Sequence, residues 1–178
     1  LFLPIILIAL IFVFLEDGHN PIFIQERTGI NNMSIKIIKI RTMKYHVSKN
    51  NLNWAKNNDS RITRIGSFIR KVRIDELPQL LSVISGDISL IGPRPERPEI
   101  DSILEKDIKN YRLRYNIKPG LSGWAQVNYP YGASVKDSYN KLSFDFFYMK
   151  NYSLLLDLII FFKTIRLVFN GRGSKPVS

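Results

Sequence analysis

Hydrophobic and polar positions divide the chain into two apolar ends and a mixed, basic middle. Residues 1–15 are apolar throughout and contain Pro4, and residues 153–169 are strongly apolar with a few charges. Residues 34–42 alternate isoleucine with lysine or arginine, which predicts a short strand with one basic face. Residues 61–72 place apolar side chains at helical spacing with most basic ones elsewhere, which predicts an amphipathic basic helix.

The two apolar ends each allow a core or a membrane interpretation. As a helix, residues 1–15 would reach about 22 Å, short of the ~30 Å hydrocarbon core of a bilayer. They could form a buried core segment or part of a membrane segment. In residues 153–169 and just beyond, Lys163, Arg166 and Asn170 share one helical stripe, which is typical of an interfacial helix but also of a core helix with a solvated edge. Asp157 and Thr164 lie on another face, where we expect polar contacts to the domain.

Turn and helix signals organise the segments between the ends. Pro78 and Gly86 predict a helix over residues 77–84, with Asp75 and Glu76 at its N-terminus. The remaining expectations are a loop over residues 49–60, a charged helix over residues 100–115 and an extended piece over residues 124–128.

Composition limits the chemistry that the chain can perform. The 178 residues are 45% hydrophobic, which suits one domain with a real core. The chain has no cysteine and only two histidines, His19 and His46, so disulfides, thiolate sites and a zinc set are excluded. Any bound metal must therefore be held by oxygen.

The net charge of +11 is concentrated in one block. Residues 35–73 hold eleven lysines or arginines against one acid, Asp59. Such a block can bind nucleic acid, an anionic membrane surface or a small anionic substrate, or it can be a solvated face without a ligand. Charge alone does not choose among these.

The residues with the clearest chemical potential are a carboxylate pair and an arginine between two prolines. Asp75 and Glu76 can supply a nucleophile and hold a divalent cation, although an acid before a proline is also a common helix cap. Arg94 stands between Pro93 and Pro95, whose fixed φ angles stiffen the backbone that presents its planar fork to a phosphate. Together they suggest chemistry on a phosphate ester.

Five ordered blocks make the chain resemble the bacterial sugar transferases, the monotopic phosphoglycosyl transferases that load a phosphosugar onto a polyprenyl phosphate. The resemblance covers nearly the whole chain. The blocks are Lys39–Met43, Asp75–Gln79, Gly92–Pro95, Lys118–Asn128 and Leu156–Thr164.

The resemblance implies a fold of the α+β class that is predominantly helical, with a single catalytic domain over residues 21–178. Residues 1–20 would be the second arm of a re-entrant membrane helix, broken at Pro4, and its exit; the first arm would precede Leu1. The resemblance also implies interfacial amphipathic helices and a location on the cytoplasmic face of the bacterial plasma membrane. A homo-oligomer is left open.

The implied reaction transfers a hexose 1-phosphate from a UDP-sugar to undecaprenyl phosphate through an aspartyl intermediate and releases UMP. Asp75 would be the nucleophile, and Glu76, with Asp75, would hold Mg²⁺. Five cations are phosphate-contact candidates: Lys39, Arg41, Arg73, Arg94 and Arg97. Arg73 departs from the small hydroxyl residue that the family commonly has there. Supporting roles fall to Asp145, Trp124 and Gln126.

Three rival functions remain at this stage. A nucleic-acid-binding module would use the basic block but leaves the apolar ends unexplained, so we expect no nucleic-acid partner. A noncatalytic peripheral membrane scaffold would use the ends and the charge without needing Asp75 and Glu76. A Mg²⁺-dependent nucleotidyltransferase or phosphatase would not need a covalent sugar phosphate. No motif identifies the sugar.

Overall fold

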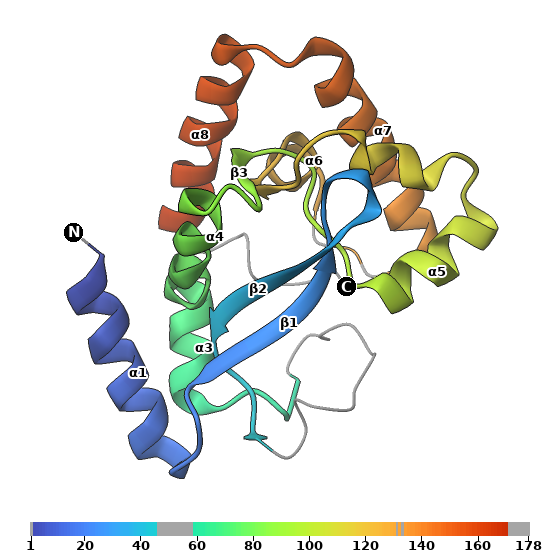
Figure 1. Cartoon of the computed structure of the whole chain (residues 1–178). Coiled ribbons are helices and arrows are strands. Elements are labelled where there is room, and N and C mark those ends of the chain that lie inside the picture. Colours follow the sequence, from blue (N-terminus) through green and yellow to red (C-terminus); the bar gives the residue numbers. More distant parts are fainter. Residues whose placement is uncertain (1, 46–58, 131, 133, 171–178) are drawn as a thin grey trace.

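A two-stranded antiparallel hairpin crosses the middle of the molecule, with helices on both sides of it (Figure 1). The computed structural model describes residues 2–45, 59–130, 132 and 134–170. The hairpin consists of β1 (Ile22–Thr28) and β2 (Ser34–Ile40), joined through the short η1 (Ile30–Asn32). A second sheet pairs β3 (Ser89–Ile91) in parallel with β4 (Gly120–Ser122). The mostly helical α+β class is confirmed, as is the strand predicted over residues 34–42.

The N-terminal apolar segment forms α1 (Leu3–Asp17), with Pro4 in its first turn. Backbone N–H groups in a first turn have no partner within the helix, so the proline costs no hydrogen bond there. One stripe of α1 packs on the hairpin and its neighbours in a core cluster formed by Ala9, Val13, Ile40 and Ile69. The remaining α1 surface is apolar and exposed, including Leu7, Ile11 and Leu15. Among the described residues, no helix combines the length and hydropathy needed to cross a membrane. The predicted division at residue 20 stays a prediction.

The predicted basic helix is confirmed as α3 (Arg64–Lys71), which begins after Thr63 accepts a hydrogen bond from the Gly66 N–H. Most of the loop predicted over residues 49–60 lies outside the described residues. The helix predicted from residue 77 begins earlier and in a tighter form. It starts as η2 (Ile74–Gln79) and continues as α4 (Leu80–Ile84).

The single helix predicted over residues 100–115 is wrong. The segment forms α5 (Pro98–Asp107) and then η3 (Tyr111–Asn116), separated by Asn110 with a left-handed φ of 63°. The break turns η3 so that Tyr111 and Tyr115, each only 1–2% exposed, join a core with α7 (Val135–Asn151). Burial of the two tyrosine rings stabilises the fold more than the backbone hydrogen bonds of one continuous helix would.

The extended piece predicted over residues 124–128 is also wrong, because this segment is the short helix α6 (Trp124–Asn128). A helix places Trp124 and Val127 on one face, against a core formed by α7 and α8 (Leu154–Phe169). The helix predicted over residues 153–169 is confirmed. Its expected polar contacts are present: Thr164 Oγ1 lies 2.6 Å from Ser122 Oγ, and Asp157 accepts a hydrogen bond from Tyr148.

Candidate active site

The helix η2 places the Asp75–Glu76 carboxylate pair beside the basic face of the hairpin. Arg73, which precedes η2, has a left-handed φ of 60°, so the chain turns sharply just before the two acids. Both carboxylates lie in the first turn of η2, where the peptide dipoles favour negative charge. Asp75 is 9% exposed, and the Glu76 side chain is 12% exposed.

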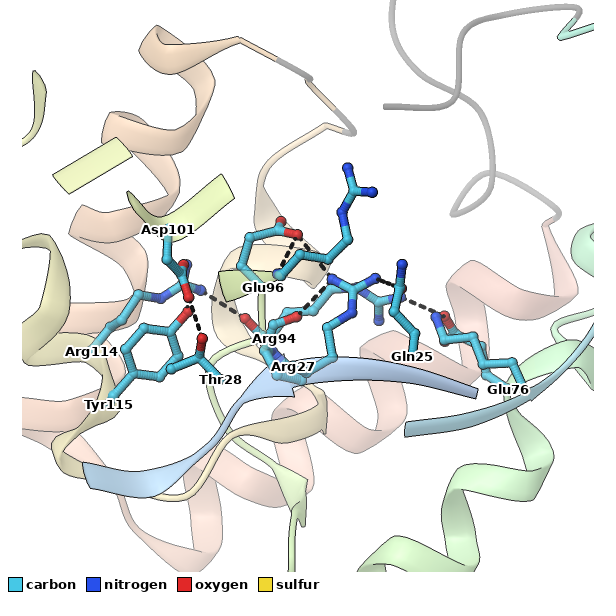
Figure 2. A network of polar contacts seen from close by, with 12 residues as sticks. Gln25, Arg27, Thr28, Glu76, Arg94, Glu96, Asp101, Arg114 and Tyr115 are labelled. Atoms are coloured by element: carbon cyan, nitrogen blue, oxygen red, sulfur yellow. Dashed lines mark hydrogen bonds and ion pairs between the residues drawn. The ribbon is translucent and has the colours of Figure 1, made fainter. Parts of the chain in front are cut away.

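Glu76 is surrounded by cations from three parts of the chain. Its Oε1 accepts hydrogen bonds from Lys39 Nζ of β2, at 3.2 Å, and from Arg94 Nη2. Arg73 Nη1 lies 3.7 Å from Oε2. Burial alone would raise the pKa of Glu76, but Arg94, Lys39 and Arg73 hold that pKa well below its usual value. Figure 2 shows Arg94 reaching Glu76. The structure thus brings together three of the five candidate phosphate contacts.

Asp75 has the opposite electrostatic character. Burial, together with the negative charge of Glu76, raises the pKa of Asp75 to about 6, against the opposing effect of Lys39 and Arg73. Among the described residues, its Oδ1 is buried and has no hydrogen-bond partner. A poorly solvated carboxylate oxygen with no hydrogen-bond donor on it retains more of its nucleophilicity than a paired one.

Lys39 also has an altered pKa. Its ammonium group is desolvated, which lowers its pKa to about 8 despite the attraction of Glu76. Lys39 is opposite Phe23 in the hairpin register, so its position follows from the strand alternation that the sequence predicted.

A small polar cleft beside the pair contains two residues that the sequence analysis missed. The cleft is lined by Arg27, Ile37, Lys39, Gln79, Arg94 and Pro95. Gln79 is 3% exposed, and its Nε2 has no acceptor among the described residues. It belongs to the Asp75–Gln79 block, so that block was the available signal. Arg27 lies on β1, where no motif marked it, and pairs with Glu96 at 2.9 Å.

The contacts of Arg41 lie outside this cluster, and its predicted role as a phosphate contact stays a prediction. Arg41 is 3% exposed, and its guanidinium is fully engaged. It forms a bidentate pair with Asp17, with both N–O distances at 2.6 Å, and donates to the carbonyls of Asn20, Met43 and His19. The hydrogen bond from Arg41 also lowers the pKa of Asp17. Arg41 thus joins the end of α1 to the hairpin.

We expect Arg41→Ala to destabilise the fold by about 3 kcal/mol, because it leaves a carboxylate and several carbonyls without their donor. Chemical denaturation measures this loss. The control is Arg112→Ala, which breaks an exposed pair with Glu105 and should change the free energy of unfolding by less than about 1 kcal/mol. A variant with unchanged stability but weaker substrate binding would instead support Arg41 as a phosphate contact.

The three supporting candidates occupy different places. Asp145 is buried and pairs with Arg114 at 2.8 Å, and Arg114 in turn donates to the backbone carbonyl of Arg94. Trp124 instead stacks on Phe147. The contacts of Asp145 lead to the site, whereas that stacking lies in the core between α6 and α7.

Two further candidates have local contacts of their own. Gln126 Nε2 donates to the Leu121 carbonyl at 3.3 Å. Arg97 precedes α5, and its N–H donates to the Glu96 carboxylate. The predicted roles of these two residues stay predictions.

The carboxylate pair suits a magnesium ion that a substrate helps to bind. Mg²⁺ in proteins is held through one or two carboxylates, with substrate phosphates and waters completing its shell. The described residues contain no cluster of three or more histidine, cysteine or acidic side chains. Asp75 and Glu76 therefore form a partial set of hard oxygen donors that a diphosphate could complete.

Comparison with known proteins identifies the class. A model of the bacterial sugar transferase family matches residues 1–171, so the chain belongs to the bacterial sugar transferase family.

Three relatives illustrate that family. The chain is 42% identical to a UDP-N-acetylgalactosamine-undecaprenyl-phosphate N-acetylgalactosaminephosphotransferase of Aeromonas hydrophila, over 98% of the chain and 41% of the relative. It is 34% identical to a UDP-glucose:undecaprenyl-phosphate glucose-1-phosphate transferase of Escherichia coli K12, over 97% of the chain and 37% of the relative. It is 38% identical to a UDP-galactose-lipid carrier transferase of Erwinia amylovora, over 94% and 37%. The chain thus spans about two fifths of the length of these relatives.

Proposed function

We propose that this chain transfers a sugar 1-phosphate from a UDP-sugar to a polyprenyl phosphate such as undecaprenyl phosphate and releases UMP. The observation that carries the proposal is the buried Asp75, with an unpartnered oxygen, next to Glu76 and its three cations. The relatives, which are named as transferases acting on UDP-sugars and undecaprenyl phosphate, support the same reaction class. Such a transfer would be an early membrane step in exopolysaccharide, O-antigen or capsule assembly.

The reaction would proceed in two displacements. An Asp75 carboxylate oxygen attacks the phosphorus atom attached to the sugar, a P–O bond forms, and the P–O bond to UMP breaks. UMP leaves with the bonding electrons, and the sugar phosphate stays on Asp75. A phosphate oxygen of the lipid then attacks the same phosphorus atom, and the Asp75 carboxylate is released. The product is a polyprenyl diphosphate sugar.

The cations of the site would allow these anions to meet. Two phosphate-bearing substrates repel each other and a carboxylate nucleophile, so local positive charge is needed at the reacting phosphorus. Lys39, Arg73 and Arg94 supply it from the surroundings of Glu76, and Arg27 lies in the adjoining cleft. Mg²⁺ held by Glu76 and Asp75 would neutralise diphosphate oxygens and stabilise the departing UMP.

An apolar groove near the nucleophile suits the lipid tail. The groove has a volume of about 530 Å³ and lies between α1 and α3. Ile74, which directly precedes Asp75, lines the groove, so a chain lying there would end near the carboxylate pair. Apolar side chains dominate the lining, among them Ile5, Ile8 and Phe68. We assign this groove to the first isoprene units of the lipid.

Exposed apolar surface on two helices supports action at a membrane surface. The outward face of α1 and much of α8, including Phe162 and Phe169, are apolar and exposed. Apolar surface of this extent on soluble proteins is unusual and suits the headgroup and acyl boundary. We propose that the protein works on the cytoplasmic face of the bacterial plasma membrane, with α1 as one arm of a re-entrant helix.

The groove assignment predicts a selective effect of Ile8→Trp. The indole would displace about two methylene groups of the lipid, worth ~0.8 kcal/mol each, so we expect the KM for undecaprenyl phosphate to rise about tenfold. UMP formed in a single turnover without lipid should be unchanged. Leu7→Trp is the matched control, because Leu7 is similarly exposed on α1 but does not line the groove. Equal lipid KM values for the two variants would refute the assignment.

The experiment that tests the function measures UMP release by membranes containing the protein. The reactions would contain Mg²⁺, undecaprenyl phosphate and, separately, UDP-glucose, UDP-galactose or UDP-N-acetylgalactosamine, because relatives differ in their sugar. Multiple-turnover UMP release that needs the lipid and one of these sugars would support the transferase. Lipid-independent hydrolysis would favour a phosphatase. No UMP from a folded, membrane-bound preparation would favour a noncatalytic scaffold.

A further inference from the structure

The backbone that carries Arg94 is held at four consecutive carbonyl groups. The donors come from β4, η3 and β1, three elements that are separate in the sequence. The four hydrogen bonds are Gly120 N to Pro93 O at 2.9 Å, Arg114 Nη2 to Arg94 O at 2.9 Å, Arg27 Nη1 to Pro95 O at 3.2 Å, and Thr28 N to Glu96 O at 2.9 Å. Every acceptor of this segment is therefore satisfied, and the segment cannot shift without breaking bonds to the rest of the fold.

Arg114 is the side chain in this set that holds the carbonyl of Arg94 itself (Figure 2). Its side chain is 11% exposed, and its charge is compensated on several sides. Nη2 lies 2.8 Å from Asp145 Oδ2, and Nη1 donates to Tyr111 Oη at 2.7 Å. The guanidinium also lies over the rings of Tyr111 and Tyr115, 5.2 and 5.5 Å from their centroids.

A second buried acid fixes the other side of the same region. Asp101, which is fully buried, accepts hydrogen bonds from Tyr115 Oη at 2.7 Å and from Thr28 Oγ1. It thereby joins η3, which carries Arg114, to β1, which also holds the Arg94 segment. Figure 2 shows Asp101 in contact with Tyr115 and Thr28. It also shows Arg114 in contact with Arg94, which reaches on to Glu76. Arg114 therefore has little freedom to move relative to Arg94.

We propose that Arg114, held by Asp145, is a positioning residue that fixes where the Arg94 guanidinium meets Glu76 and the donor phosphate. This inference rests on the proposed function. Prolines on both sides restrict φ at positions 93 and 95, and Arg114 fixes the carbonyl between them. Arg114 thus fixes the backbone position from which the Arg94 side chain extends. Arg114 itself contacts neither the carboxylate pair nor, on this account, the substrate.

Arginine is the side chain that this position requires. Its fork reaches the Asp145 carboxylate, the Arg94 carbonyl and the Tyr111 hydroxyl together. A lysine would keep the charge that Asp145 needs, but its single ammonium group cannot maintain all three directions at once. Arg114→Lys therefore separates positioning from charge compensation.

The test compares kcat/KM for the UDP-sugar in wild type, Arg114→Lys, Arg94→Ala and the double variant. We expect Arg114→Lys to lose roughly 100-fold in kcat/KM, because a small misplacement of a binding group has an effect of that order. In the Arg94→Ala background, Arg114→Lys should have no further effect, because the group that it positions is gone. Arg112→Lys, an exposed neighbour paired with Glu105, is the matched control and should match wild type.

A purely structural role gives a different pattern. Loss of folded protein would lower activity by the same factor in both backgrounds and leave the KM of the remaining enzyme unchanged. Equal factors in both backgrounds, or wild-type kcat/KM for Arg114→Lys, would overturn the inference. If Arg114→Lys does not fold, Asp145→Asn in the same two backgrounds decides the question in the same way. An inactive wild type would instead count against the proposed function.

Discussion

Asp75→Asn is expected to abolish sugar phosphate transfer. Loss of a nucleophile that acts in a covalent mechanism lowers turnover by about four orders of magnitude or more. The amide has nearly the same shape as the carboxylate but cannot form the phosphosugar intermediate. UMP release in the presence of UDP-sugar, Mg²⁺ and lipid measures the effect. Because Asp75 is buried and its pKa is raised by burial, the neutral amide should not destabilise the fold.

Asp87→Asn is the matched control for this variant. Asp87 is an exposed acid twelve positions further along, in the turn after α4, where it accepts a hydrogen bond from Ser85. Its substitution should leave UMP release at the wild-type rate. Substantial UMP release by folded Asp75→Asn would show that Asp75 is not the nucleophile, whatever the behaviour of Asp87→Asn.

Glu76→Gln is expected to have the second largest effect. The substitution keeps the shape but removes the charge that Lys39, Arg73 and Arg94 surround. Three cations would then repel one another without a counter-charge, and the proposed principal ligand of Mg²⁺ would be lost. We expect turnover to fall roughly a hundredfold and the Mg²⁺ concentration for half-maximal activity to rise about tenfold.

A magnesium titration of UMP release, with a chelator to remove residual metal, measures both effects. Glu105→Gln is the control, because Glu105 is an exposed acid whose partner, Arg112, is also at the surface. Glu105→Gln should show the wild-type magnesium dependence. An unchanged half-maximal Mg²⁺ concentration in Glu76→Gln would mean that Glu76 only neutralises the neighbouring cations and does not hold the metal.

Regular periodicity accounts for the parts of the fold that the sequence predicted. The alternation over residues 34–42 placed Lys39 on a strand, and the helical spacing of Ile65, Phe68 and Ile69 placed α3. The helix signals around Pro78 correctly predicted that Asp75 and Glu76 lie at the start of a helix. These are local patterns, and they hold because burial on one face of an element imposes a period on its sequence.

The features that the sequence did not predict depend on contacts between segments that are distant in the chain. Nothing local marks Asn110 as a left-handed break or Arg114 as the donor to the Arg94 carbonyl, since both follow from how η3 packs against α7 and the Arg94 segment. Arg41 belongs to the Lys39–Met43 block of the resemblance, yet its partner, Asp17, lies 24 positions away in sequence. Basic charge in a sequence does not reveal whether a substrate or a buried acid will compensate it.

Trapping the intermediate tests the central claim most directly. The protein would be incubated with a UDP-sugar and Mg²⁺ in lipid-free detergent, quenched with acid, digested and analysed by mass spectrometry. The account predicts a hexose phosphate adduct on the peptide that contains Asp75, absent from Asp75→Asn and discharged when undecaprenyl phosphate is added before the quench. Wild-type protein that releases UMP in the presence of lipid but never carries this adduct would contradict the account and favour direct transfer between the two substrates.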